Sequence, residues 1–173
     1  MTRTLVAAAA AGLALVVSSP ALAQSIIKNP GDHVSSVELE PHLTLRTAFF
    51  DGIGGGFRAT VPIVSNGFVS TINNSVGIGF GLDYIDLRPC NGCNHVGYWV
   101  VPVVMQWNFY LTKSWSVFGE PGVAINLNRP TQCDHCEKAD FMLQVGARWH
   151  FGQYTALTMR LGWPYASIGV SFL

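Results

Sequence analysis

Beyond its first 23 residues the sequence has no apolar run that approaches the ~20 consecutive residues needed for a membrane-spanning helix. It also has little charge and no excess of either sign, because ten Lys and Arg residues balance ten Asp and Glu residues. Electrostatics therefore does not draw the chain to nucleic acid, and we expect no nucleic-acid partner. The glycine-rich stretch 52–56 is not followed by a helical pattern, which excludes a phosphate-cradling loop.

The N-terminus has the features of a secretory signal peptide. Arg3 precedes an apolar run over residues 5–17, and small residues stand at positions −3 and −1 before Gln24. This pattern predicts cleavage near Ala23 and export to an oxidising compartment. We therefore divide the chain into a signal peptide (1–23), an N-terminal periplasmic segment (24–36) and a barrel domain (37–173).

The stretch 141–151 defines how the rest of the chain is built. Its odd positions are all apolar and include Trp149 and Phe151, whereas its even positions include Arg148 and His150. A period of two is typical of a β-strand. Aromatic residues on one face and ionic residues on the other fit a wall with lipid on one side and a polar lumen on the other. If the mature chain enters a membrane, we expect it to do so as strands of this kind.

The same alternation recurs along the mature sequence. It predicts eight strands over 37–49, 57–63, 76–87, 99–111, 115–127, 141–151, 157–163 and 166–172. Residues 51–56 form a predicted glycine turn, and 65–74 is interpreted as a long or bulged connection rather than an extra short strand. An even number of antiparallel strands brings both ends to one side, and closure removes the edges that lipid cannot satisfy.

Aromatic residues gather near both ends of the predicted strands, as the two interfaces of a bilayer favour. One group comprises Trp107, Phe109, Tyr110, Trp115, Trp149, Phe151 and Tyr154. The other comprises Phe49, Phe50, Tyr84, Tyr98, Trp99 and Trp163. The inward faces carry four acids and four bases, which we expect to pair, because an isolated buried charge is strongly destabilising. They are Glu38, Glu40, Asp83 and Glu120, and Arg46, Arg58, Arg148 and Arg160.

With its signal peptide, eight alternating strands and charged lumen, the chain resembles the small outer-membrane barrels of the OmpA transmembrane-domain and OmpX kind. The resemblance covers nearly all of the mature sequence and implies an all-β, antiparallel, up-and-down transmembrane barrel in a bacterial outer membrane. It also implies that outer-membrane lipid surrounds the protein. We expect a monomer without a cofactor, and an extracellular or envelope protein is the candidate for a further partner.

Two C-x-x-C pairs are the strongest local motif: Cys90 with Cys93, and Cys133 with Cys136. If the chain ends are periplasmic, both pairs lie in loops on the outer side. We expect disulfides there, with the pairing open, because an exported protein meets an oxidising environment. A Zn²⁺ site formed by the same four cysteines, with His95 and His135 nearby, is the alternative, and free or redox-active thiols are a third.

The sequence indicates the class of protein more closely than its task. We expect a non-enzymatic barrel with a structural or surface-interaction role. The alternatives are a lipid-modifying barrel enzyme, a pore and a soluble periplasmic barrel that binds a ligand. No Ser-His-acid set falls together by strand parity, and His33 with Ser35 lacks an acid partner. Eight strands leave too little room for a pore once the lumen holds the charged side chains.

Overall fold

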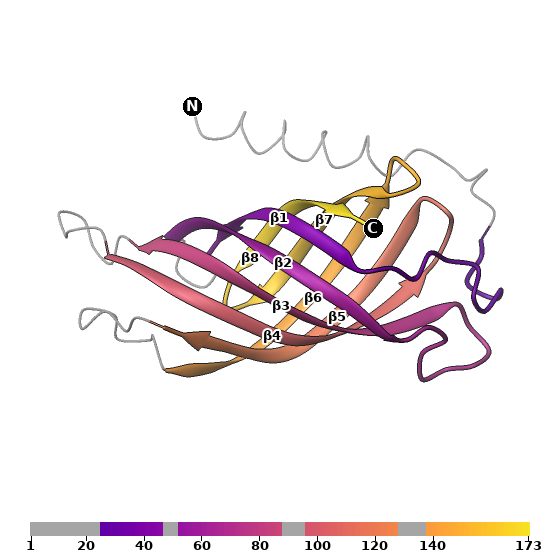
Figure 1. Ribbon diagram of the computed structural model, residues 1–173, viewed down its shortest axis with the longest axis horizontal. Coiled ribbons are helices and arrows are strands. Elements are labelled where there is room, and N and C mark those ends of the chain that lie inside the picture. Colours follow the sequence, from indigo (N-terminus) through magenta and orange to yellow (C-terminus); the bar gives the residue numbers. More distant parts are fainter. Residues whose placement is uncertain (1–24, 47–51, 88–95, 128–137) are drawn as a thin grey trace, which may run out of the picture.

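The computed structural model describes residues 25–46, 52–87, 96–127 and 138–173. These residues form eight strands in one sheet. The strands are β1 (Glu38–Leu45), β2 (Gly52–Val64), β3 (Asn74–Leu87), β4 (Val96–Tyr110), β5 (Trp115–Asn126), β6 (Ala139–His150), β7 (Thr155–Trp163) and β8 (Ala166–Phe172). Each strand pairs antiparallel with the next, and β8 pairs with β1, so the sheet closes (Figure 1). The predicted eight-stranded up-and-down barrel is confirmed.

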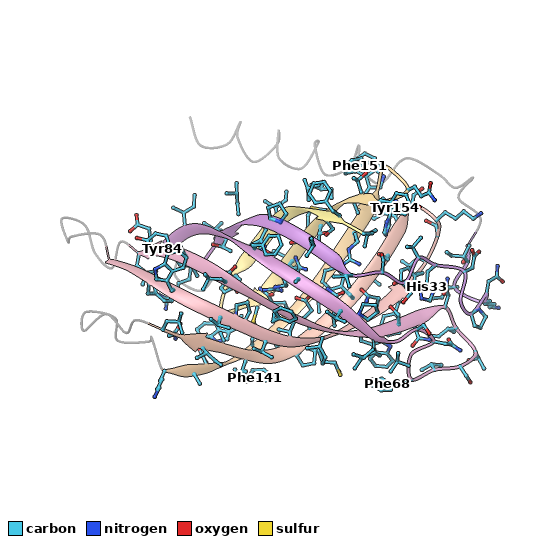
Figure 2. The ribbon with its side chains drawn as sticks, in the orientation of Figure 1. His33, Phe68, Tyr84, Phe141, Phe151 and Tyr154 are labelled. Carbon is cyan, nitrogen blue, oxygen red and sulfur yellow. The ribbon has the colours of Figure 1, made fainter. Side chains whose placement is uncertain are left out.

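The apolar face of the strands points away from the barrel axis. Leu43, Val145 and Leu161 are each more than 60% exposed, and Figure 2 shows Tyr84 and Phe141 on the outer surface. The opposite face is buried, as the alternating burial of β1 illustrates from Glu38 to Leu45. Exposed apolar residues over a whole sheet surface are unusual for a protein in water, and they suit contact with lipid.

The predicted glycine turn at 51–56 is wrong, because β2 begins at Gly52 and the glycines lie within the strand. They are needed there for close approach to β3. A Cβ at Gly54 would come within 2.0 Å of the Tyr84 carbonyl oxygen, and one at Gly56 within 2.0 Å of Asp83 Oδ1. A glycine inside a strand often marks such a contact rather than a turn.

The connection 65–73 contains no strand, as predicted, and it contacts the barrel through Phe68, whose ring centre lies 5.4 Å from that of Trp107. Asn74 Nδ2 donates to the carbonyl oxygens of Val69 and Ile72, and the Trp107 indole donates to Asn74 Oδ1 at 3.0 Å. Val76 is only 1% exposed, although Ile78 and Phe80 at the following even positions of β3 are exposed. The start of β3 is therefore buried on both faces, whereas its even positions from Ile78 to Tyr84 are exposed.

Two ends of the barrel can be distinguished (Figure 1). At the N-terminal end lie residues 25–37, the connection 65–73, the turns 111–114 and 151–154, and the end of β8. At the far end, β3 finishes and β4 begins, and an apolar cluster lies in this part of the lumen. The buried cluster that fills it comprises Ile85, Leu87, Tyr98, Val100, Val104, Ala124, Met142 and Tyr165. Tyr98 therefore belongs to the interior and not to an aromatic belt, because its even position in β4 faces inward.

Residues 25–33 pack against the N-terminal end of the barrel. The Ile26 amide donates to the Leu111 carbonyl at 3.0 Å, and the Asn73 amide donates to the Ile27 carbonyl at 2.7 Å. Ile26 is buried as a result. No helix in the described ranges is long and apolar enough to cross a membrane.

Candidate functional site

The interior of the barrel holds the eight charged side chains that the strand patterns place inward, and we call this set the lumen charge network. Its members are Glu38, Glu40, Arg46, Arg58, Asp83, Glu120, Arg148 and Arg160, and all of them are buried. The alternation of each strand determines which side chains enter the lumen, whereas the register between strands determines which of them meet.

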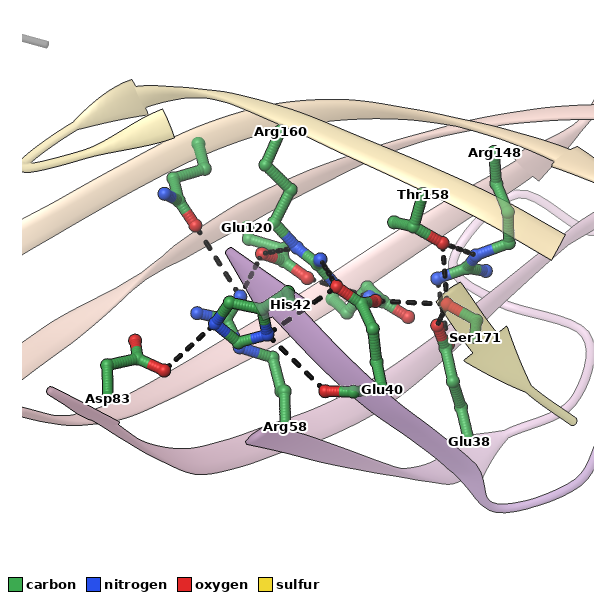
Figure 3. Close-up of polar contacts among 12 residues, drawn as sticks. Glu38, Glu40, His42, Arg58, Asp83, Glu120, Arg148, Thr158, Arg160 and Ser171 are labelled. Atoms are coloured by element: carbon green, nitrogen blue, oxygen red, sulfur yellow. Dashed lines mark hydrogen bonds and ion pairs between the residues drawn. The ribbon is translucent and has the colours of Figure 1, made fainter. Parts of the chain in front are cut away.

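Glu120 in β5 accepts hydrogen bonds from three other strands (Figure 3). Arg58 Nη1 of β2 lies 2.7 Å and Arg160 Nε of β7 lies 2.9 Å from Glu120 Oε2. Gln106 Nε2 of β4 donates to the other carboxylate oxygen at 2.7 Å. Arg160 also donates to Glu40 of β1. One fully buried carboxylate therefore connects opposite sides of the barrel.

A second group of the network lies closer to the N-terminal end (Figure 3). Arg148 Nη2 donates to Glu38 Oε2 at 2.7 Å. The Ser171 hydroxyl lies 2.6 Å from the second Glu38 oxygen and 3.0 Å from Glu40 Oε2, so it joins the two groups. Thr158 in turn lies 2.5 Å from Ser171.

Asp83 forms a third group with a histidine and a tyrosine. His42 Nε2 lies 2.9 Å from Asp83 Oδ1, and the Tyr165 hydroxyl donates to Asp83 Oδ2. Gln144 Nε2 donates to the Tyr165 carbonyl at 2.5 Å. Sequence reasoning missed Tyr165, because it lies in the turn between β7 and β8, where the period of two is interrupted.

Phe118 provides the apolar contact within this ionic interior. The guanidinium carbons of Arg148 and Arg160 lie 4.9 Å and 5.1 Å from the centre of its ring, which is cation–π distance. Gly146, opposite Phe118 on β6, leaves the space for the ring, since a Cβ there would come within 2.2 Å of Phe118 Cζ. An inward phenylalanine is visible in the alternation of β5, but its two arginine partners are not.

The lumen charge network therefore has the geometry of a structural core. Glu38, Glu40 and Glu120 each meet an arginine, and Asp83 meets His42 and Tyr165. Arg46 is buried beside the far end of β1. Buried ion pairs of this kind favour one register of the strands, whereas removal of a single partner leaves an uncompensated buried charge.

A cavity of about 500 Å³ lies at the N-terminal end, and we call it the mouth cavity. The segment 26–34 forms one wall, and the ends of β4 and β6 with the turns that follow them form the others. Its polar lining side chains are Asp32, His33, Tyr110, Thr112, Lys113, Arg148, His150 and Gln153. His33 stacks on Tyr110 with ring centres 4.1 Å apart, which fixes the wall segment against β4.

The structure brings one serine and one histidine together that strand parity did not single out. Ser116 Oγ lies 3.2 Å from His150 Nε2. Ser116 is fully buried, however, so its hydroxyl is not presented to a substrate. His33 contacts Asn73 Oδ1 at 2.6 Å, and Ser35 is exposed. Neither pair has the arrangement of an accessible nucleophile with its base.

The cysteine motifs lie outside the described residues, so disulfide formation and the zinc alternative both stay predictions. Among the residues that the structure describes, no group of three or more His, Cys, Asp and Glu side chains could hold a metal ion. The predicted signal peptide also lies outside the described residues.

A closed up-and-down barrel of eight antiparallel strands, with apolar side chains outside and ionic side chains inside, is the fold of the small outer-membrane-type β-barrels. Two solved structures with this fold are similar to the chain. A de novo designed transmembrane β-barrel shares 13% identity over 84% of this chain and 98% of its own, with a TM-score of 0.55. The Yersinia pestis outer membrane protein Ail, solved in a phospholipid bilayer nanodisc, shares 10% identity over 80% of this chain and 99% of its own, with a TM-score of 0.53. The sequence matches no protein-family model and no curated protein.

Proposed function

We propose that this protein is an outer-membrane barrel that conducts no ions and acts as a rigid base for its outer loops, in a structural or surface-interaction role. The observation that carries the proposal is the reversed polarity of the barrel. Outward residues such as Leu143 and Val103 are exposed, whereas Arg148, Arg160 and Glu120 are buried. A soluble ligand-binding barrel needs the opposite arrangement.

The filled interior supports the absence of a pore. The ionic pairs around Glu120 cross the lumen, and the apolar cluster around Met142 and Tyr98 fills it beyond them toward the far end. An eight-stranded barrel has an interior just wide enough for its own side chains. We therefore expect planar-bilayer recordings of the protein to show no discrete conductance, with a sixteen-stranded porin as the positive control.

The first experiment tests the class of protein. Membrane fractionation is followed by gel electrophoresis with and without boiling, because closed membrane barrels commonly resist detergent until heated. We expect the protein in the outer-membrane fraction with a heat-dependent shift in migration. Recovery of the whole protein in the soluble periplasmic fraction would overturn the proposal.

A second experiment tests the orientation, with the N-terminal end in the periplasm and the cysteine-bearing loops outside. After reduction of intact cells, a membrane-impermeant maleimide should label the native cysteines. The matched control is a variant with all four cysteines changed to Ser and Lys113→Cys in the turn 111–114. This variant should be labelled only after the outer membrane is permeabilised, and the reverse pattern would refute the orientation.

A further inference from the structure

The mouth cavity is a candidate ligand-binding site. At about 500 Å³ it has the size of sites that take small organic molecules, which are commonly 300–1,000 Å³. It lies outside the paired ionic core, and its lining comes from the N-terminal segment, β4 and β6. Arg148, which is 2% exposed, lies between the lumen and the mouth cavity and forms the floor of the cavity.

The lining of the mouth cavity favours negative charge. Lys113, which is exposed, and Arg148 are cations that line it, and His33 and His150 contribute imidazoles. The carboxylate that holds Arg148, Glu38, is not among the residues that line this cavity. Arg148 thus pairs with Glu38 in the lumen, donates to Asn108 and Thr158 at 3.4 Å each, and also lines the mouth cavity. Asp32 is the acidic side chain among the described lining residues, and it is exposed at the rim.

The two imidazoles are held in place by neighbours, and these contacts decide which ring nitrogen of the neutral side chain carries the hydrogen. Asn73 Nδ2 donates to the Asp32 carbonyl at 2.9 Å, so Asn73 Oδ1 is an acceptor and His33 Nδ1 must donate to it. In the neutral ring His33 Nε2 then carries no hydrogen, so it can accept but not donate a hydrogen bond. His150 Nε2 lies 3.2 Å from Ser116 Oγ, and when the serine hydroxyl donates to it, His150 Nδ1 carries the hydrogen that can be donated to an anion.

Apolar side chains complete the mouth cavity. Ile26 and Val34 line it from the N-terminal segment, and the ring of Tyr110 lies beside them under His33. A ligand that fits both the cationic and the apolar lining of the mouth cavity has one acidic group and a small apolar body. Charged hydrogen bonds to lysine and arginine would orient the acid, and contact with Ile26 and Val34 would remove apolar surface from water.

We propose that the mouth cavity binds a small organic anion, with a carboxylate or phosphate group directed to Lys113, Arg148 and His150. In the orientation proposed above, the ligand would reach the site from the periplasm. Binding itself depends only on the barrel fold and the docked segment 25–34, so it can be tested whether or not that orientation holds.

The experiment uses the full mature chain in nanodiscs of zwitterionic phosphatidylcholine, so that the lipid supplies no net charge. Benzoate, phenyl phosphate and benzylamine are titrated separately and followed by saturation-transfer NMR and calorimetry. We expect saturable binding of benzoate or phenyl phosphate and none of benzylamine. Stronger binding of one anion than the other identifies the carboxylate or the phosphate as the preferred group.

Two lysine variants test the location. Lys113→Met should raise the dissociation constant of the bound anion about fivefold, the upper end for an exposed ion pair. Lys28→Met is the control, because it removes one positive charge at the same end of the barrel. Lys28 is exposed and does not line the mouth cavity. This variant should leave binding unchanged. His150→Gln gives a second variant within the lining and should also weaken binding.

Three results would overturn the proposal: benzylamine binding as tightly as the anions, equal effects of the two lysine variants, or no saturable binding of either anion below about 10 mM. A heat-dependent gel shift of each variant shows that it has folded, so that loss of binding is not confused with loss of structure. The same gel tests the barrel class independently of any ligand.

Discussion

Replacement of Glu120 by Gln tests whether the lumen charge network stabilises the barrel. The carboxylate is fully buried and accepts hydrogen bonds from Arg58 at 2.7 Å, Arg160 at 2.9 Å and Gln106 at 2.7 Å. Glutamine keeps the size of the side chain, but it loses the charge and one acceptor oxygen. Arg160 retains its ion pair with Glu40, whereas Arg58 retains hydrogen bonds to the neutral groups of Gln144 and Tyr165 within the described residues.

Removal of one member of a buried ion pair commonly costs about 3–5 kcal/mol, because the remaining charge stays desolvated. We expect E120Q to lower the free energy of unfolding by an amount in this range. That is a large part of the ~5–15 kcal/mol available to a typical domain. Urea titration in phospholipid vesicles, followed by tryptophan fluorescence and gel shift, measures the loss.

Two further variants make the E120Q result specific. Asp32→Asn removes one negative charge at an exposed position and should change stability by less than about 0.5 kcal/mol. Glu120→Gln combined with Arg58→Met removes the arginine that the first change leaves unpaired. The double variant should therefore lose at least ~1 kcal/mol less than the sum of the single variants. A loss below about 1 kcal/mol for E120Q, or strict additivity, would refute the view that these charges depend on each other.

Three other predictions concern the packing, the outer face and the loops. Gly146→Ala should destabilise the barrel by about 1–3 kcal/mol because its Cβ would meet the Phe118 ring, whereas Gly119→Ala, with nothing within 4 Å, should be nearly neutral in the same urea assay. Leu161→Arg, midway along the outer wall, should lower the free energy of unfolding in vesicles by about 2–4 kcal/mol. Leu127→Arg, beyond the end of β5, should lower it by at most ~1 kcal/mol. Equal losses would contradict a bilayer centred on Leu161. Mass spectrometry of the unreduced protein should show no alkylation of Cys90, Cys93, Cys133 or Cys136 by iodoacetamide, and full alkylation without reduction would remove the disulfide prediction.

The alternation of side chains was sufficient to predict the fold and its polarity. In a strand, successive side chains point to opposite faces, so a period of two assigns Arg148 and Val145 to different sides without knowledge of any partner strand. The number of strands followed from counting such segments, and closure followed from their outward apolar face. The same rule correctly placed the charges of β1 and β7 in the interior.

The glycines of β2 show where local reasoning fails. A run of glycine is a turn signal when it is considered alone, because glycine adopts conformations that other residues avoid. Gly56 is required for a different reason, since Asp83 on the neighbouring strand occupies the space that a side chain would take. Tyr165 was missed for a related reason, because it lies in the turn between β7 and β8, where the alternation is interrupted.

The sequence by itself determined that this chain forms eight strands, with an apolar face outside and an ionic face inside, because side-chain direction depends only on the backbone of each strand. Only the tertiary structure decided which charges pair, how Tyr165 reaches Asp83, and that residues 25–34 close over a cavity at the N-terminal end. These contacts join residues far apart in the sequence, such as Arg160 and Glu40, which are 120 positions apart, and they depend on strand register and loop docking.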